Sequence, residues 1–351
     1  MILKYILAFL VITSVLQAKV GNCQVGNGKS SFVKCLEKEA KKTDSIEDIN
    51  FLASFYAIDK EYDKSISWYK KSAEKGNAKA AFFLGGIYDE ALDDKKEALR
   101  WYKKSAMQDY DDAMQHLNET MENVYGKSNT IEIYKKAIKK GEDVYWNKRF
   151  LANFYFRIEA YEKRIEILNE MLIQYPKKKD KWLVSLGNTY MKKFLNNREK
   201  ELEYYQEAAK LGNKMAMHNL GLYYGDKKDY KTAEMWFRKA DENQMVCLMY
   251  KEIIKDKVRA LDCYREEAKS GKINEIGRLA YIYQVEFEEY DEAFKLYKDI
   301  VEKGDSSGAL NMAIAYKYHF HNDEKAVFWY KKAASMGNQK AIKYLRKKGL
   351  L

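Results

Sequence analysis

Residues 68–88 read WYKKSAEKGNAKAAFFLGGIY, and close versions of this stretch return along the rest of the chain. Residues 101–117 read WYKKSAMQDYDDAMQHL, residues 204–224 read YYQEAAKLGNKMAMHNLGLYY, and residues 329–345 read WYKKAASMGNQKAIKYL. With degenerate versions included, the Trp-Tyr position recurs nine times at intervals of 27 to 37 residues. Such a period indicates a repeat array in which each repeat buries its apolar face against its neighbours.

Each repeat is predicted to contain two helices. The second helix has one apolar stripe at helical spacing, made by Ser65, Trp68, Tyr69 and Ala73. We expect Gly76-Asn77 to end that helix, because glycine and asparagine both tolerate the left-handed cap conformation. The first helix of the next repeat carries a stripe of Ala80, Leu84, Gly85 and Tyr88. The small residues in this stripe would let neighbouring helices approach closely.

The quoted residues resemble the Sel1-like repeat family, a relative of the tetratricopeptide solenoids. The family pattern is Ala-x-x-Trp-Tyr-x-x-Ala-Ala-x-x-Gly-Asn-x-x-Ala-x-x-x-Leu-Gly-x-x-Tyr, and the resemblance covers residues 46–351. The segment near residues 161–190, which holds Pro176, departs from it, and the repeat around Cys263 is short. The resemblance implies an all-α fold, a right-handed α/α superhelical solenoid of about nine helix-turn-helix repeats.

The resemblance also implies a role. Proteins of this kind are typically adaptors and scaffolds that bind other proteins through a concave surface, and many bacterial members are exported. Some cysteine-rich relatives are associated with penicillin binding and β-lactamase activity, and they carry a cysteine pair in nearly every repeat. This chain has four cysteines in all, so the features of that subgroup do not transfer. We expect a protein partner of the cell envelope, with β-lactamase activity as the alternative.

The N-terminus has the three parts of a secretory signal peptide. Lys4 is followed by an apolar run over residues 5–16 and by a small residue, Ala18. The run is shorter than the roughly 20 residues that a spanning helix needs, so we expect cleavage after residue 18 and no stable membrane insertion afterwards. A membrane anchor and a lipoprotein cut before Cys23 are the weaker alternatives. The mature chain is predicted to be periplasmic, with secretion as a further alternative.

Four cysteines suggest two disulfides in an exported chain. Cys23 and Cys35 would close a small loop in an N-terminal segment, residues 19–45. The sequence CQVGNGKS at residues 23–30 looks like a phosphate-binding loop, but it has Cys23 in place of the first glycine and no buried strand before it. Cys247 and Cys263 fall at matching levels of two antiparallel helices. A disulfide and two buried thiols are both consistent with that placement.

One position of the repeat holds tyrosine in seven repeats: Tyr69, Tyr102, Tyr134, Tyr205, Tyr264, Tyr297 and Tyr330. Two interpretations remain open. The rings pack between layers of the array, or some of their edges line the concave groove, where aromatic rings beside lysines would suit a protein segment.

Other chemistry has little support in the sequence. The net charge is +11, but the lysines come in pairs with acidic residues nearby, which is typical of a solvated helix face rather than of nucleic-acid binding. An envelope-surface binder attracted by positive charge is a further alternative. The Ser-x-x-Lys matches that begin at Ser31, Ser67 and Ser72 are expected by accident in so lysine-rich a chain. His319, His321 and Asp323 indicate a solvated turn or a zinc site. We predict no catalytic, cofactor or metal site.

Overall fold

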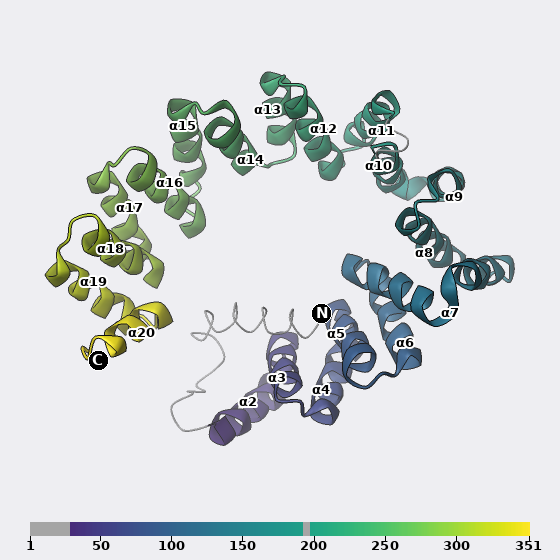
Figure 1. Cartoon of the computed structure of the whole chain (residues 1–351), viewed down its shortest axis with the longest axis horizontal. Helices are drawn as coiled ribbons and strands as arrows, with labels where there is room; N and C mark the ends of the chain where they lie inside the picture. The colour runs from purple at the N-terminus through teal and green to yellow at the C-terminus, as the bar shows by residue number, and fades with distance from the viewer. Residues whose placement is uncertain (1–28, 192–196) are drawn as a thin grey trace. The chain divides into compact units, whose positions relative to one another are not determined.

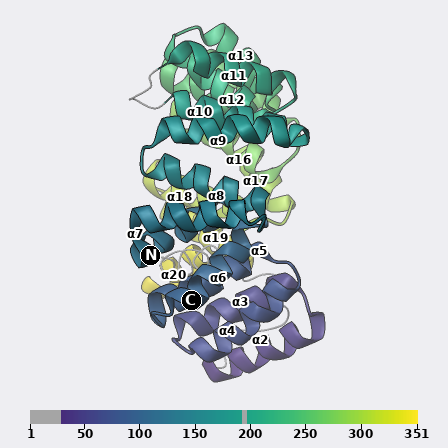
Figure 2. The same ribbon diagram turned by 90° about the vertical axis from the view of Figure 1, so that its right-hand side faces the viewer.

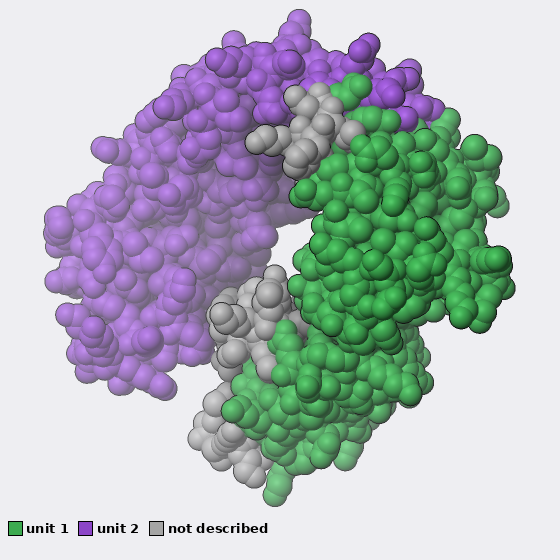
Figure 3. All heavy atoms as spheres, turned by 45° about the vertical axis from the view of Figure 1, so that its right-hand side comes forward, with its two compact units in different colours: residues 1–197 green, residues 198–351 purple. Residues whose placement is uncertain are grey.

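The structure, a computed structural model, describes residues 29–191 and 197–351, and these residues contain helices and turns but no strand. The chain divides into two compact units, one ending at Asn197 and the other running from Arg198 to Leu351. Figure 3 colours the two units separately. The predicted signal peptide, residues 1–18, and Cys23 lie outside the described residues.

The first unit holds nine of the described helices (Figure 1). They are α2 (Lys29–Thr43), α3 (Ile46–Ile58), α4 (Tyr62–Glu74), α5 (Ala78–Gly86), α6 (Lys95–Ala106), α7 (Asp111–Lys139), α8 (Val144–Arg157), α9 (Tyr161–Gln174) and α10 (Lys179–Tyr190). Helix α5 continues as a π-helical turn over Ile87–Ala91, and Pro176 begins a 3-10 turn before α10. Consecutive helices from α2 to α10 pack against each other (Figure 2).

The second unit is built in the same way. Its helices are α11 (Arg198–Lys210), α12 (Lys214–Asp226), α13 (Tyr230–Lys239), α14 (Asn243–Leu248), α15 (Lys257–Ala268), α16 (Ile273–Glu286), α17 (Tyr290–Glu302), α18 (Ser306–Tyr318), α19 (Asp323–Ser335) and α20 (Gln339–Lys347). Helix α14 is short and passes into a π-helical turn over Met249–Ile254. Consecutive helices pack here too, so the all-helical repeat architecture predicted from the sequence is confirmed.

The asparagine of each Gly-Asn pair has a different role from the one predicted from the sequence. Gly76 does take the left-handed conformation after α4, with φ 86°. Asn77 does not: it has φ −80° and ψ 105°, and its side chain accepts a hydrogen bond of 2.7 Å from the backbone N–H of Ala80. Asn213 and Asn338 cap α12 and α20 in the same way. The asparagine therefore begins the first helix of the next repeat instead of ending the previous one.

Two features of the first unit were not expected. Residues 29–43 form α2, whose Phe32, Leu36 and Ala40 pack with Leu52 and Tyr56 of α3, so the predicted N-terminal segment contains a helix that covers the first repeat. Helix α7 spans two helices of the repeat pattern and is broken at Gly126, which has φ 74° and ψ 165°.

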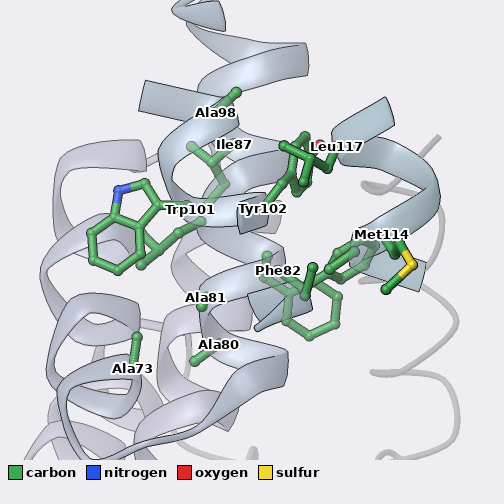
Figure 4. Close-up of a cluster of buried hydrophobic side chains, with 14 of the residues drawn as sticks. Ala73, Ala80, Ala81, Phe82, Ile87, Ala98, Trp101, Tyr102, Met114 and Leu117 are labelled. Atoms are coloured by element: carbon green, nitrogen blue, oxygen red, sulfur yellow. The ribbon is translucent and has the colours of Figure 1, made fainter. Parts of the chain in front are cut away.

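The core of each repeat forms where a small residue of the first helix meets an aromatic ring of the second. A Cβ atom on Gly85 would lie 2.4 Å from Cδ1 of Tyr102, so only glycine permits this approach of α5 to α6. Figure 4 shows Tyr102 among the buried side chains of these helices and of α7, including Phe82, Ile87 and Leu117. This close packing turns the second-helix ring inward.

Candidate functional site

The tyrosine row predicted as groove-lining is buried. Each of Tyr69, Tyr102, Tyr134, Tyr205, Tyr264, Tyr297 and Tyr330 is at most 5% exposed. The packing interpretation therefore describes these rings, and their proposed place in a binding groove was wrong. The reason is the close approach of first and second helices, which leaves no solvent beside the ring.

The tyrosine hydroxyls have partners inside the core. Tyr69 lies 2.6 Å from Ser54 Oγ, Tyr134 donates to Asn118 Oδ1 at 2.7 Å, and Tyr297 donates to Gln284 Oε1 at 2.9 Å. Each partner belongs to the first helix of the same repeat. A buried hydroxyl with a partner avoids the cost of a lost hydrogen bond to water, so these tyrosines join the two helices of a repeat.

Another set of side chains, which the sequence analysis did not select, is exposed on the first helices of the second unit. We call it the first-helix row: Met215, Leu222, Tyr281, Val285 and Tyr318. Leu222 and Tyr281 hold the same repeat position, two residues after the buried Leu220 and Leu279. Gly221, next to Leu222, is buried against Phe237 of α13, whereas Leu222 itself is exposed. Within this unit α12, α14 and α16 lie on the inner side of the curve (Figure 1).

A cavity of about 750 Å³ adjoins this row. Residues of α12, α13, α14, α15, α16 and their turns line it. His218 lies four residues before Leu222 on α12, and Arg278 lies three residues before Tyr281 on α16. Residues three or four apart are neighbours on a helix, so the cavity lining and the first-helix row lie next to each other on α12 and on α16.

The cavity has more acidic than basic side chains. Its carboxylates are Asp241, Glu242, Glu266, Glu267 and Glu275. Its basic side chains are Arg238, Lys272 and Arg278, with the imidazole of His218 against Glu242. Each of the five carboxylates has a basic partner. Lys214 and Lys269, which do not line the cavity, pair with Asp241 and Glu266, and the other three pair with His218, Arg278 and Lys272.

The electrostatics of the cavity centre on one buried pair. Glu267 Oε2 lies 3.4 Å from Nη2 of Arg278, and the Glu267 side chain is 7% exposed. Burial raises the pKa of the Glu267 carboxyl, and Arg278 acts against that rise. The Nε atom of Arg278 is buried without a hydrogen-bond partner. At the rim, a hydrogen bond from Ser270 lowers the pKa of Glu275.

A disulfide joins Cys247 and Cys263, the second of the two pairs suggested by the sequence. Cys247 stands where other repeats have Gly85 or Gly221, and Cys263 stands at the Trp position and lines the cavity. In this repeat the disulfide therefore takes the place of the glycine of the first helix and of the large ring of the second helix. The predicted Cys23–Cys35 bond includes Cys23, which is outside the described residues.

The remaining candidate residues do not assemble into a chemical site. Ser72 is buried in α4, and Ser270 lies in the turn after α15 in the other unit. The His319 ring packs against Tyr290 at 5.3 Å, and His321 lies in the turn before α19. In the part of the chain that the structure describes, no group of three or more His, Cys, Asp or Glu side chains is placed to hold a metal ion. None of the described helices is long and apolar enough to cross a membrane.

The model of one protein family, the Sel1 repeat, matches the chain at residues 50–77, 78–110, 197–213, 214–240 and 308–338. The chain contains five Sel1 repeats. Sel1-repeat proteins generally mediate protein–protein interaction. The matches to this Sel1-repeat chain leave out residues 111–196 and 241–307, which contain the stretch near Pro176 and the short repeat around Cys263.

Solved structures similar to this Sel1-repeat protein are themselves helical repeats. A protective antigen of uropathogenic Escherichia coli with an SLR fold is 19% identical, with a TM-score of 0.34 over 91% of this chain and 76% of its own. A Sel1 repeat protein from Oxalobacter formigenes is 20% identical, with a TM-score of 0.32 over 92% and 91%. The C-terminal part of a TPR repeat-containing protein from Cytophaga hutchinsonii is 17% identical, with a TM-score of 0.41 over 65% and 98%. Among curated proteins, none has a matching sequence.

Proposed function

We propose that this Sel1-repeat protein is an exported scaffold that binds a protein partner along the first-helix row. The observation that supports the proposal is the set of exposed apolar side chains on α12 and α16, which lie next to residues that line a cavity rich in ion pairs. Apolar and aromatic side chains next to paired charges are typical of protein-binding surfaces. Binding then rests on shape and charge complementarity, with no chemical step.

The side chains that line the cavity indicate which side chains of a partner could bind there. Each of its five carboxylates already pairs with a basic side chain of this chain, so a lysine or arginine of the partner would bind there by replacing one of those basic side chains. The first-helix row would take apolar side chains of the same segment. A partner with apolar residues flanking a basic one fits both parts of the surface.

A pull-down from envelope extract of the producing organism tests this surface. The L222S/Y281S variant removes two exposed apolar side chains of the row, and we expect it to lose proteins that the unaltered chain retains at high salt. The matched control M235S/V258S removes two exposed apolar side chains from α13 and α15, the second helices of the same unit. Equal losses from both variants, or retention of anionic polymers only, would argue against the proposal.

Export has separate support. The N-terminal sequence has the basic, apolar and small-residue parts of a signal peptide, and disulfides such as Cys247–Cys263 persist mainly in oxidising compartments. We place the mature protein in the periplasm, with secretion beyond the cell as the alternative. N-terminal sequencing of protein from cell fractions tests this: the expected first residue is Lys19 in the periplasmic fraction. An intact N-terminus in the cytoplasmic fraction would contradict export.

A further inference from the structure

The first unit has a second exposed surface, on the part of α7 that follows Gly126. Asn129, Ile133, Lys136 and Lys139 follow each other at spacings of four and three residues, so they share one side of the helix. Tyr125, next to the break, lines the same hollow of about 540 Å³. We call these five residues the α7 basic face.

The face is open because this repeat departs from the pattern. Ile133 stands at the Trp position, where Trp101 of the preceding repeat is 6% exposed. Ile133 is 39% exposed, and Tyr125 is 42% exposed. The φ of 74° at Gly126 interrupts the helix just where Tyr125 emerges. Two apolar side chains of this repeat are therefore exposed to solvent where they line the hollow.

This surface has more basic than acidic side chains. Lys135, Lys136 and Lys139 line the hollow with a single carboxylate, Glu132. Glu132 pairs with Lys135 at 3.9 Å. None of the ion pairs between described residues includes Lys136 or Lys139. These two ammonium groups are thus available to a partner, next to exposed apolar surface.

We propose that the α7 basic face docks an acidic amphipathic helix of a partner protein. The helical part of the face is 13 residues long and spans about 20 Å, because an α-helix rises about 1.5 Å per residue. That length fits three to four turns of a partner helix, with apolar side chains on Ile133 and Tyr125 and carboxylates beside Lys136 and Lys139. A hollow suits the ridge of a helix better than a flat lipid surface does. The proposal concerns a different unit and different residues from the first-helix row, so it stands independently of the proposed function.

Fluorescence anisotropy of the full chain with a designed peptide tests this docking. The probe is an 18-residue blocked helix of Glu, Ala and Leu whose leucines form one stripe, measured in about 0.15 M salt. A peptide of the same composition with its leucines spread around the helix is the peptide control. We expect the striped peptide to bind, and K136E/K139E to weaken its binding about tenfold or more, because two attractive charge pairs become repulsive.

The charge control is K331E/K332E, which makes the same change in net charge on α19, the second helix of another repeat. We expect it to change binding less than about twofold, because salt screens the general effect of a change in net charge. We expect I133S to weaken binding about tenfold, because an apolar contact with the peptide is lost. Circular dichroism verifies that each variant folds. Equal effects of the two lysine variants would overturn the proposal, as would equal binding of the two peptides. Failure of the striped peptide to bind would also overturn the proposal. If the chain instead bound vesicles with one third phosphatidylglycerol, the face would bind lipid and not a helix.

Discussion

Gly221 of α12 faces the ring of Phe237 of α13 so closely that a Cβ atom on Gly221 would lie 2.5 Å from Cε1 of that ring. Phe237 is buried, and the ring has no room to move aside. We predict that Gly221→Ala lowers the free energy of unfolding by about 1–3 kcal/mol, because overpacking a close contact strains the core. Denaturant unfolding followed by circular dichroism measures the change.

Gly225 of the same helix provides the control. A Cβ atom there would meet nothing within 4 Å, and the backbone is helical. Gly225→Ala should therefore leave stability unchanged or raise it by up to about 1 kcal/mol, since alanine favours a helix over glycine. If Gly221→Ala were as well tolerated as Gly225→Ala, the close contact would have no energetic role.

The Cys247–Cys263 disulfide should stabilise the short repeat of the second unit. The two cysteines are separated by 16 residues, and a loop of about that length corresponds to about 3 kcal/mol of stabilisation when it is closed. We predict a loss of this size in the double variant C247A/C263A, measured by urea unfolding. Alkylation and mass spectrometry of the oxidised chain should find neither thiol free. If the double variant unfolded at the same urea concentration as the unaltered chain, the prediction would be contradicted.

Buried tyrosine hydroxyls should differ in how much they contribute to the free energy of unfolding, according to their hydrogen-bond partners. Tyr134→Phe leaves the Asn118 Oδ1 atom without its donor inside the core, although Asn118 Nδ2 keeps its bond to Phe150 O. We predict a cost of about 1–3 kcal/mol, as for other unsatisfied buried acceptors. Urea unfolding of the variant measures it.

The comparison variant is Tyr69→Phe. Its partner Ser54 still donates to Asn50 O at 2.8 Å, so only a weak hydroxyl acceptor loses a partner. The cost should be smaller, about 0.5–1 kcal/mol, as for an ordinary hydrogen bond. A larger loss in Tyr69→Phe than in Tyr134→Phe would reverse the expected order.

The tyrosine row predicts unfolding at alkaline pH. Burial raises the pKa of Tyr297 to about 12, and it also raises the pKa values of Tyr69, Tyr134 and Tyr205. An unfolded tyrosine ionises near pH 10, so its neutral form is favoured by the folded chain. The resulting stability is complete below about pH 10 and is lost as the pH rises toward 12. Absorbance at 295 nm should report tyrosine ionisation in step with the loss of helix; full ionisation near pH 10 with the helices intact would contradict this.

The sequence could predict the helices and much of the core because both depend on short-range order. A stripe such as Trp68, Tyr69 and Ala73 repeats at helical spacing, and the same stripe returns in each repeat. The role of Asn77 could not be read in this way, because a Gly-Asn pair is compatible both with ending one helix and with beginning the next. Helix α2 was missed because its sequence, rich in charge, lies outside the repeat.

The candidate site was harder to predict. A tyrosine at one repeat position is equally compatible with a groove and with a core, and the distance between two helices decides which it is. Gly85 permits a distance so short that Tyr102 is buried. The first-helix row and its cavity combine side chains of helices α12 to α18, whose relative placement no local pattern contains. Nor does a local pattern separate the chain at Asn197 into two units.

Repeat spacing and residue type therefore determined, from sequence alone, that this chain is an all-helical repeat array with a disulfide candidate in its short repeat. Those features follow from helix periodicity, which is encoded within about 35 residues at a time. Only the tertiary structure decided that the tyrosines are buried, that Leu222 and Tyr281 are exposed, and that Glu267 meets Arg278 in a cavity. Burial and pairing depend on neighbouring helices, and packing between repeats brings those helices together.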